Sequence, residues 1–515
     1  MLVKTFGSAV FGVDARTITV EVDVNNQGKP DVVIVGLPDS AVKESMERVE
    51  SAIKSNGYKM PRTKLVVNLA PADIRKSGTA FDLPIAIAVL GATEQMENAE
   101  ALKEYVIMGE LSLDGEVRPI KGALPIAIQA RKEKFKGLIV PKQNAREAAI
   151  VNDIEVYGVT HINEVTDFFE GKNVIPATIV DTREEFYNAQ STDDCDFSDV
   201  KGQENIKRAL EIAAAGGHNA ILIGPPGAGK TMLAKRIPTI LPPLSLLEAL
   251  ETTKIHSVVG KLAENATLVT KRPFRSPHHT ISDVALVGGG GNPQPGEISM
   301  AHNGVLFLDE LPEFKRTVLE VMRQPMEERK VTISRAKVSL DFPASFMLVA
   351  SMNPCPCGYF NHPEKQCTCG PGTVQRYLAK ISGPLLDRID LHVEVTPVPF
   401  SELSSTKTYE KSSSIRERVI RARAIQDKRY KDHPGTYSNA QMSSKLLKEV
   451  CVLDTPSSNL LKVAMTKLSL SARAYDRILK VSRTIADLAG SENIRSEHVA
   501  EAIQYRSLDR ENWGA

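Results

Sequence analysis

Hydrophobic positions in the N-terminal third of the chain follow two different periods. Residues 65–71 (LVVNLAP) form a short continuous apolar run that is typical of a buried strand, whereas residues 82–90 (DLPIAIAVL) are apolar on most faces of a helix. Residues 106–120 (VIMGELSLDGEVRPI) turn at an Asp-Gly pair, which predicts a hairpin. This mixture predicts a compact α+β domain over residues 1–170.

The pattern changes after this domain. Residues 171–198 end in an acidic stretch with few large aliphatic side chains and are predicted to be an exposed linker. Over residues 199–395, helix, strand and glycine-rich turn alternate, as in a parallel sheet flanked by helices. Residues 396–413 form a second predicted linker. Residues 414–515 contain few glycines and show helical periodicity, so they are predicted to be an all-helical lid.

Composition argues against a membrane or secreted protein, but it does not identify a binding partner. The 515 residues include no apolar run approaching the ~20 residues of a membrane span. The N-terminus reads as strands and lacks the layout of a secretory signal, so we expect a cytoplasmic protein with no membrane partner. The net charge is only +1, so any nucleic acid must be contacted through local basic patches or a pore lining.

One segment has the pattern of a phosphate-binding loop. Residues 224–231 (GPPGAGKT) match G-x-x-x-x-G-K-[ST], with a predicted strand before them and a helix start after them. The glycines let backbone N–H groups close around the phosphates of ATP. Lys230 is expected to reach the β- and γ-phosphates, and Thr231 to bind Mg²⁺. The predicted nucleotide-binding residues are Gly224, Pro225, Pro226, Gly227, Ala228, Gly229, Lys230 and Thr231.

Two further strand ends carry polar residues suited to hydrolysis. Residues 305–310 (VLFLDE) form an apolar strand that ends in two acids. Asp309 is expected to hold Mg²⁺ directly or through water, and Glu310 to orient and deprotonate the attacking water. Asn353, after the next predicted strand, is a candidate to position the same water, although an Asn-Pro turn is the alternative.

Four of the six cysteines lie in one short loop, residues 355–369. Clustering of this kind in a cytosolic chain favours a metal site over disulfides, and four thiolates fit tetrahedral zinc. The pairs are C-x-C, which departs from the usual C-x-x-C spacing. A reduced loop without metal, or His362 as a substitute ligand, therefore stays open. The four candidate zinc ligands are Cys355, Cys357, Cys367 and Cys369.

Together these motifs resemble the magnesium-chelatase branch of the AAA+ ATPases and, within it, the bacterial ComM/YifB family. The resemblance covers essentially the whole chain. Besides the two ATP motifs it rests on residues 273–290, 295–314, 353–359, 383–395 and 471–488. It implies an α/β fold class: an AAA+ P-loop parallel sheet with a helical lid. It also implies a hexameric DNA helicase that uses ATP and Mg²⁺ to drive branch migration during recombination or natural transformation.

The resemblance also assigns roles to three residues. Asn353 matches the first sensor, Arg388 the arginine finger that reaches into a neighbouring subunit, and Arg473 the second sensor on the lid. A fixed guanidinium stabilises charge that develops on the transferred phosphoryl group, and a finger acting in trans requires an oligomer. The alternatives are an intrachain salt bridge from Arg388 to Asp387 or Asp390, and a solvated helix position for Arg473.

Two segments are candidates for contact with branched or single-stranded DNA. The first lies between the ATP motifs, where the resemblance implies an insert that projects toward the ring channel. Its basic and histidine residues are Lys271, Arg272, Arg275, His278 and His279. The second is a predicted hairpin at residues 331–346 with Arg335 and Lys337 near its tip. Such residues bind phosphates without reading sequence. A structural role for the histidines and a solvated hairpin tip are the alternatives, and the basic run at 414–431 is typical of a solvated helix face.

Residues 65–143 resemble the catalytic domain of Lon protease, which has a ribosomal-S5-like (domain 2) α+β fold. Ala80 occupies the position of the Lon serine, and the Lon lysine falls near Leu124. Without nucleophile and base there is no route for acyl transfer, so we expect a scaffold for assembly or DNA engagement. Two alternatives to a DNA motor stay open for the whole chain: a magnesium-chelatase-type ATPase and a remodelling chaperone that does not act on DNA.

Overall fold

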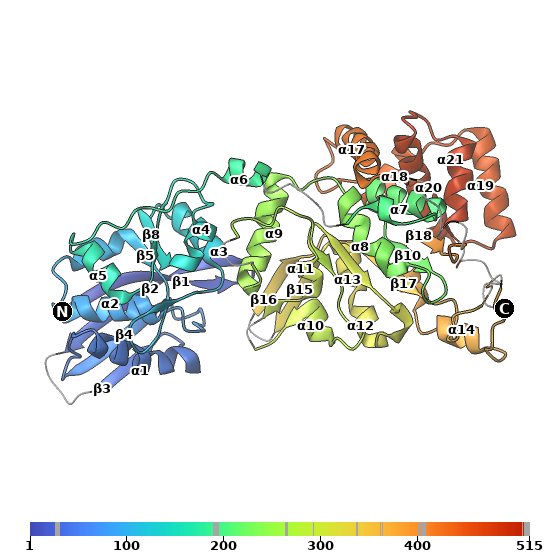
Figure 1. Ribbon diagram of the computed structural model, residues 1–515. Helices are drawn as coiled ribbons and strands as arrows, with labels where there is room; N and C mark the ends of the chain where they lie inside the picture. Colours follow the sequence, from blue (N-terminus) through green and yellow to red (C-terminus); the bar gives the residue numbers. More distant parts are fainter. Residues whose placement is uncertain are drawn as a thin grey trace. The chain divides into compact units, whose positions relative to one another are not determined.

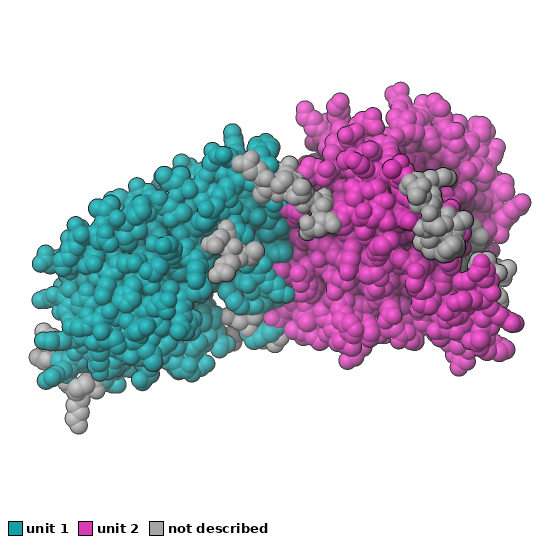
Figure 2. Space-filling model, in the orientation of Figure 1, with its two compact units in different colours: residues 1–190, 245–270, 290–294 teal, residues 191–244, 271–289, 295–515 magenta. Residues whose placement is uncertain are grey.

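The chain folds into two compact units, which Figure 2 colours separately. Unit 1 contains residues 1–190, 245–270 and 290–294, and unit 2 contains residues 191–244, 271–289 and 295–515. The structure is a computed structural model that describes residues 1–25, 31–188, 195–262, 266–291, 293–335, 338–360, 362, 364–399, 402, 408–506 and 508.

Unit 1 is built on a seven-stranded mixed sheet (Figure 1). The strands, in spatial order, are β3 (Asp31–Val35), β4 (Lys64–Ala70), β2 (Asp14–Asn25), β1 (Leu2–Phe11), β5 (Tyr105–Ile107), β8 (Gly137–Pro141) and β9 (Glu155–Val159). β1 pairs antiparallel with β2, whereas β1, β5, β8 and β9 pair in parallel. The predicted α+β character and the strand predicted at residues 65–71 are confirmed.

The helices of unit 1 include one that is buried on every side. They are α1 (Ser40–Ser55), α2 (Asp82–Ala92), α3 (Ala123–Lys132), α4 (Lys142–Ala148), α5 (Ile162–Phe169) and α6 (Thr182–Asn188), with the 3₁₀ turn η1 (Ala99–Glu104). Every residue of α2 is buried, which confirms the helix predicted from its all-round apolar pattern. Its carboxylate, Asp82, is compensated by Arg48 Nε at 2.7 Å, because a buried charge requires a partner. The predicted hairpin is also present as β6 (Glu110–Leu111) and β7 (Val117–Arg118).

Unit 1 also includes helix α9 (Leu246–Val259), which comes from the segment predicted to belong to the ATPase core. Ser257 donates a hydrogen bond to the buried carboxylate of Glu147, 110 positions away, and Lys254 Nζ lies 2.6 Å from Asp14. The division into units therefore departs from the predicted domain order at residues 245–270. A contact between positions so far apart leaves no local pattern in the sequence, and the domain boundaries themselves stay predictions.

Unit 2 is built on a five-stranded parallel sheet. Its order is β11 (Phe274–Arg275), β14 (Val305–Leu308), β17 (Met347–Met352), β10 (Ala220–Ile223) and β18 (Leu391–Glu394). All four strand pairs are parallel, as the alternation of helices and strands predicts. The carboxyl ends of β10, β14 and β17 consequently meet at one edge of the sheet. An antiparallel hairpin is formed by β15 (Lys330–Arg335) and β16 (Val338–Pro343).

Helices surround this sheet and form the lid. The core helices are α7 (Glu204–Gly216), α8 (Lys230–Ile240), α10 (Asp283–Val287), α11 (Glu297–Met300), α12 (Arg316–Val321), α13 (Arg323–Glu328), α14 (Thr373–Leu378) and α15 (Gly383–Leu386). The lid helices are α17 (Ser412–Arg429), α18 (Ser444–Val450), α19 (Thr455–Lys467), α20 (Ala472–Leu488) and α21 (Ser496–Gln504). The short elements are η2 (Phe197–Asp199), η3 (Leu311–Glu313), η4 (Asn439–Gln441), β12 (Gly288–Gly289) and β13 (Gln294–Pro295). Across the described ranges, no helix is both long enough and apolar enough to cross a bilayer.

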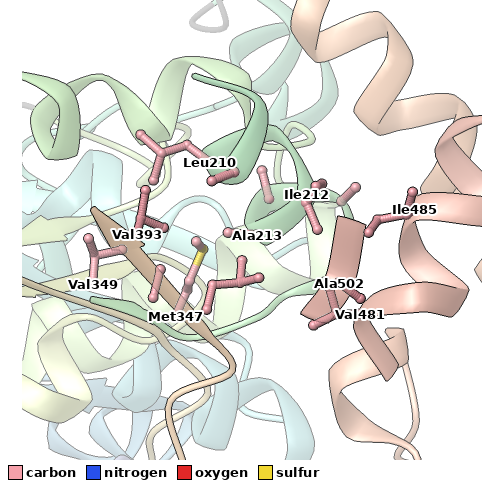
Figure 3. Packing of buried hydrophobic residues seen from close by; sticks show 14 of the residues in the cluster. Leu210, Ile212, Ala213, Met347, Val349, Val393, Val481, Ile485 and Ala502 are labelled. Carbon is pink, nitrogen blue, oxygen red and sulfur yellow. The ribbon is translucent and has the colours of Figure 1, made fainter. Parts of the chain in front are cut away.

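Sheet and lid share a single hydrophobic core. Helix α7 packs against β18 on one side and against α17 and α20 on the other. Leu210 and Ala213 of α7 belong to the same buried cluster as Val349 of the sheet and Ile485 and Ala502 of the lid (Figure 3). The lid is therefore anchored to the sheet through α7, so it is fixed in the folded chain by apolar burial.

Candidate functional site

The phosphate-binding loop connects β10 to α8 at the carboxyl edge of the unit 2 sheet. Gly224 N donates to Met352 O at 3.2 Å, which ties the start of the loop to β17. A Cβ on Gly224 would lie 2.3 Å from Val395 O, so the backbone approach excludes any side chain there. Gly227 and Gly229 have φ values of 79° and 85°, a conformation that glycine adopts without strain. The loop glycines of the motif are thus explained by local geometry.

Lys230 lies inside this loop and contacts the first-sensor candidate. Its Nζ donates to Gly224 O at 2.6 Å, to Pro225 O at 2.9 Å and to Asn353 Oδ1 at 3.1 Å. Burial lowers the pKa of Lys230, against the opposing charges of Asp309 and Glu310. A phosphate anion in the loop would favour the charged ammonium, so the site fits an anionic ligand. Two predicted residues, the first residue of α8 and the residue that follows β17, are brought together here.

The predicted magnesium ligands also meet. Thr231 Oγ1 donates to Asp309 Oδ2 at 2.8 Å, and the other carboxylate oxygen accepts from Ser351 Oγ and from Glu310 N. Hydroxyl and carboxylate oxygens are the ligands that Mg²⁺ prefers. A bound metal–nucleotide complex would supply a polarised phosphoryl group, and Lys230, Thr231 and Asp309 are the residues that would hold it.

Glu310, the candidate base, follows Asp309 and faces solvent more than its neighbour does. Its backbone is left-handed, with φ 53°, and its side chain is 58% exposed. His279 Nδ1 lies 3.7 Å from Glu310 Oε2, and the His278 and His279 ring centroids are 4.1 Å apart. The carboxylate is therefore free of any strong ion pair among the described residues and is accessible to a water molecule, as its expected role requires.

Arg388 lies at the opposite edge of the sheet from its own phosphate loop. β10 and β18 are parallel, with Ala220 opposite Leu391, and Asn219 Nδ2 donates to Arg388 O at 3.1 Å at their amino ends. The guanidinium pairs with Glu327 and donates to Pro384 O at 2.5 Å. An intrachain salt bridge thus exists, but with Glu327 and not with the aspartates considered from the sequence.

Arg473 on α20 is 70% exposed and lies 2.7 Å from Asp387 Oδ2. The next basic residue on this helix, Arg477, pairs with Asp390 Oδ1 at 3.0 Å. Asp387 and Asp390 flank Arg388 and Ile389 in the turn before β18. The finger and second-sensor roles stay predictions, because both concern a nucleotide and a neighbouring subunit.

The candidate DNA-binding residues differ in whether their side chains already have partners within the chain. Arg275 forms a bidentate ion pair with Glu297, with N–O distances of 2.6 and 2.8 Å. Arg272 donates to the carbonyl groups of Pro242 and Asn303, which is a structural role. The β15–β16 hairpin is confirmed, with Arg335 paired to Val338 at its end. Lys337 lies outside the described residues, as does the side chain of Arg335, so DNA contact stays a prediction.

The four cysteines converge although the loop that carries them is irregular. Their sulfur atoms all lie within 4.8 Å of one another, and Cys355 is fully buried. The printed pairs are Cys355–Cys357 at 3.3 Å, Cys357–Cys367 at 3.5 Å and Cys355–Cys367 at 3.8 Å. Although burial opposes it, hydrogen bonds from the backbone and from neighbouring thiols lower the pKa of Cys357 to about 5. His362 instead accepts from Glu364 N and Lys365 N at 3.0 Å.

The Lon-like turn in unit 1 holds no nucleophile at the expected position. Ala80 O accepts from Gly109 N at 3.0 Å, and Leu124 is fully buried in the core. The nearby Thr79 hydroxyl is bonded to Glu110, and Lys76 Nζ is buried against the Gly36 carbonyl at 3.0 Å. The positions that resemble the Lon serine and lysine therefore have structural roles.

Sequence reasoning missed two residues of the ATP site. Ser351 is fully buried and holds Asp309, and it is the lone polar side chain in the otherwise apolar strand β17 (MLVASM), which is the signal that marks it. Gln203 has φ 60° and donates from Nε2 to Ala228 O at 2.9 Å, within the phosphate loop. No local pattern points to Gln203, because the contact joins it to a segment 25 positions away.

Comparisons with known proteins agree with this arrangement. Family models match residues 20–144 (subunit ChlI of Mg-chelatase), 196–403 (magnesium chelatase, subunit ChlI) and 409–506 (the ChlI C-terminal part). The chain is 45% identical over 510 residues to the competence protein ComM of Haemophilus influenzae, covering 99% of this chain and 98% of that protein. It is 45% identical to the uncharacterized protein YifB of Escherichia coli, covering 98% and 96%.

A third relative concerns unit 1. Lon protease 2 of Bacillus subtilis is 32% identical over 161 residues, which is 28% of this chain and 27% of that protein. The P-loop, the Asp309–Glu310 pair and the parallel sheet are the parts of an ATPase, and this family implies ATP and Mg²⁺ as its ligands. The chain therefore belongs to the ComM/YifB family of magnesium-chelatase-like AAA+ ATPases, with a Lon-like domain before the ATPase module.

Proposed function

We propose that this ATPase is a ring-forming motor that acts on DNA, most specifically a hexameric helicase that promotes branch migration. The observation that carries the proposal is the full-length similarity to a protein named for competence, 45% identical over 99% of this chain. Uptake and integration of DNA require strands to be exchanged, which is work for an ATP-driven motor. The same activity would serve general recombination in a host that does not take up DNA, and we propose that the protein acts in the cytoplasm.

The position of Arg388 supports a ring. Arg388 and its own phosphate loop lie at opposite ends of the four-residue strands β10 and β18, roughly 13 Å of extended chain apart. An arginine at that edge is poorly placed to reach its own nucleotide but well placed to reach a neighbour's. A heterologous, head-to-tail contact of this kind closes into a ring when the rotation between subunits permits. Hydrolysis would then depend on assembly.

The β15–β16 hairpin supports a grip on the DNA backbone. It is an antiparallel pair whose tip sequence contains Arg335 and Lys337, two cations suited to sequence-independent phosphate contact. Arg275 is a weaker candidate, because its guanidinium already forms a bidentate ion pair with Glu297. Among the DNA candidates we therefore favour the hairpin.

One experiment separates this proposal from the other functions. ATPase turnover of the full chain is measured with and without forked or three-stranded DNA, together with strand displacement, and Lys230→Ala serves as the control. Stimulation and displacement that require Lys230 are expected. If neither appears, a chelatase-type ATPase or a chaperone without a DNA substrate replaces the motor. Native mass spectrometry with a slowly hydrolysed ATP analogue tests the hexamer.

The second cofactor we propose is Zn²⁺ at the cysteine cluster. Zn–S bonds of about 2.3 Å in a tetrahedron place sulfur atoms about 3.8 Å apart. The separations of 3.3, 3.5 and 3.8 Å lie at or within 0.5 Å below that value, and all four sulfur atoms lie within 4.8 Å of one another, so the residues fit the ion. The ligands would be Cys355, Cys357, Cys367 and Cys369, which the metal would hold as thiolates.

Metal analysis tests this assignment directly. Protein purified without chelator is expected to contain about one zinc per chain by atomic emission, as one four-ligand site requires. Cys367→Ser should remove most of it, whereas Cys195→Ser, outside the cluster, should not. Zinc far below one per chain in the unaltered protein rejects the site.

A further inference from the structure

The cysteine loop returns to the phosphate loop after leaving it. Gly358 has φ +84°, and a Cβ built on it would lie 2.6 Å from Pro226 Cδ and 3.3 Å from Pro226 Cγ. Such a distance is shorter than any real Cβ contact, so only glycine permits the two loops to approach this closely. Pro226 is the third residue of the phosphate-binding motif. The contact is therefore made to the ring of a proline within the phosphate-binding loop.

The same loop contacts the phosphate site at its other end. Asn353 Oδ1 accepts from Lys230 Nζ at 3.1 Å, and Cys355, two residues later, is fully buried. Gly358 N donates to Cys355 O at 3.0 Å, which closes a turn between the two contacts. A stretch of six residues thus contacts the lysine and the proline of the motif, and it contains two of the four thiols.

The loop lacks regular secondary structure where it is described. Among its described residues, the segment from 353 to 370 contains no helix or strand. The sulfur atoms of Cys357 and Cys367, 3.5 Å apart, link the part near the phosphate loop to the part beyond it. A metal ion bound to thiols on both parts closes this loop and restricts its conformations, as structural metal ions do.

We propose that the metal centre formed by the four cysteines positions the phosphate loop: it holds Gly358 against Pro226, so that nucleotide affinity depends on metal occupancy. The inference rests on the proposed zinc site and on the ATP site described above. The backbone N–H groups of a phosphate loop bind well only when they already point at the anion, so a brace on that backbone affects binding before any chemical step. Gly358 is a positioning residue, and it does not touch the nucleotide.

A pair of glycine substitutions isolates this contact. Gly358 and Gly372 both have left-handed backbones, with φ +84° and +71°, so alanine strains both. A Cβ at Gly372 would meet only Gln375 Oε1 at 3.7 Å, an ordinary contact remote from the motif. Gly358→Ala is expected to weaken binding of a fluorescent ATP analogue about tenfold with zinc content unchanged, whereas Gly372→Ala changes affinity less than about twofold.

A second substitution tests whether the effect passes through Pro226. Pro226→Ala removes the Cγ and Cδ atoms that the new methyl group would strike. In that background, Gly358→Ala is expected to have a clearly smaller effect on nucleotide affinity than in the natural chain, which is the non-additivity expected of residues in contact. Equal effects in both backgrounds, or equal effects of Gly358→Ala and Gly372→Ala, overturn the proposed contact.

Removal of the metal completes the test. Nucleotide affinity of the full chain is measured before chelation, after chelation and after zinc is restored, and thermal melting checks that the chain stays folded. Affinity is expected to fall and then recover with zinc alone. Loss of zinc without loss of affinity overturns the positioning role and leaves the zinc site intact. A protein that never holds zinc overturns the site itself, and a protein that holds zinc but binds no nucleotide overturns the ATP site.

Discussion

Arg473 Nη1 lies 2.7 Å from Asp387 Oδ2, beside the residue that is the arginine-finger candidate. Arg388, that candidate, follows Asp387 in the chain and pairs with Glu327. Both arginines are thereby placed at the amino edge of the sheet, whereas the phosphate loop follows the carboxyl end of β10. Arg388 and Arg473, two cations of the kind that stabilises negative charge on a transferred phosphoryl group, therefore lie at one edge of the sheet, away from the chain's own phosphate loop.

Arg388→Ala is expected to reduce ATPase turnover at least 100-fold while thermal melting is unchanged, because fingers are worth about 10³–10⁵ in rate. Glu327→Gln, which removes only its partner, should retain turnover. If the finger acts in trans, mixing Arg388→Ala with Lys230→Ala restores part of the activity, since each subunit supplies what the other lacks. Unchanged turnover in the single variant contradicts the assignment, and failure to complement contradicts its action in trans.

Glu310→Gln is expected to lower hydrolysis by roughly 10²–10⁴ while the affinity for ATP is kept, because the amide occupies the same space but accepts no proton. Steady-state turnover and equilibrium binding of a fluorescent nucleotide separate the two effects. Glu313→Gln, at a nearby exposed acid paired with Lys380 at 3.2 Å, is the matched control. Equal turnover in both variants would show that Glu310 is not the base.

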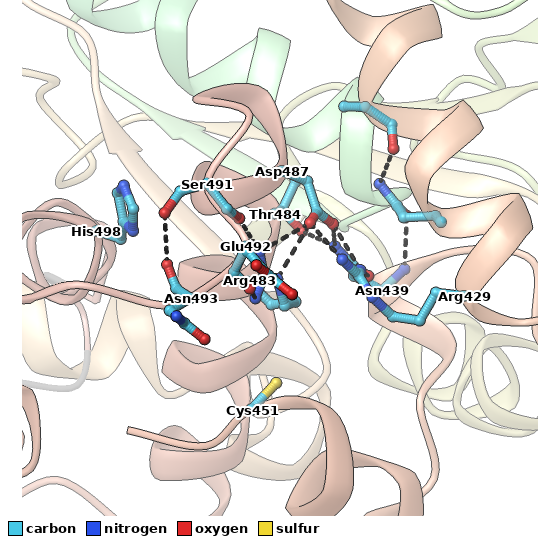
Figure 4. A network of polar contacts seen from close by, with 12 residues as sticks. Arg429, Asn439, Cys451, Arg483, Thr484, Asp487, Ser491, Glu492, Asn493 and His498 are labelled. Atoms are coloured by element: carbon cyan, nitrogen blue, oxygen red, sulfur yellow. Dashed lines mark hydrogen bonds and ion pairs between the residues drawn. The ribbon is translucent and has the colours of Figure 1, made fainter. Parts of the chain in front are cut away.

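Asp487 holds together a buried polar network in the lid (Figure 4). It accepts from Arg429 at 2.6 and 2.8 Å and from Arg483 at 3.1 Å, and Asn439 Nδ2 donates to it at 2.8 Å. Asp487→Ala removes the carboxylate partner of the buried Arg483 and the partly buried Arg429, and should lower the free energy of unfolding by about 3–5 kcal/mol. Urea denaturation measures it. Glu497→Ala, at a carboxylate that is 69% exposed, should cost under about 1 kcal/mol.

His392 predicts how stability depends on pH. Burial, and then the charge of Arg506, lowers the pKa of His392 well below its usual value. The unfolded chain binds a proton below pH ~6.5 while the folded chain does not, so stability is fully present above that pH and is lost as pH falls through it. The loss is at most about 1.4 kcal/mol per pH unit for this group. Urea titrations between pH 7.5 and 5.5 should show a shallower slope for His392→Asn than for His433→Asn, an exposed control.

Much of the ATP site was predictable because each of its motifs is local. The glycines at 224, 227 and 229 follow from backbone geometry within a few residues, and Asp309 follows the strand that positions it. Parallel strands place their carboxyl ends together, and the ends of β10 and β17 accordingly bring Lys230 and Asn353 into contact. The convergence of the four cysteine sulfur atoms was predictable because all four residues lie within one short loop, residues 355–369.

What only the tertiary structure decided are contacts between distant positions. The sequence by itself determined the phosphate loop, the acidic pair and the helical lid, because these depend on periodicity and short-range backbone geometry. It did not place α9 with unit 1, pair Arg388 with Glu327, or bring Gly358 against Pro226. These contacts join residues that are 61 positions apart (Arg388 and Glu327), 110 apart (Ser257 and Glu147) and 132 apart (Gly358 and Pro226). Their specificity comes from packing and charge compensation that exist only after the chain has folded.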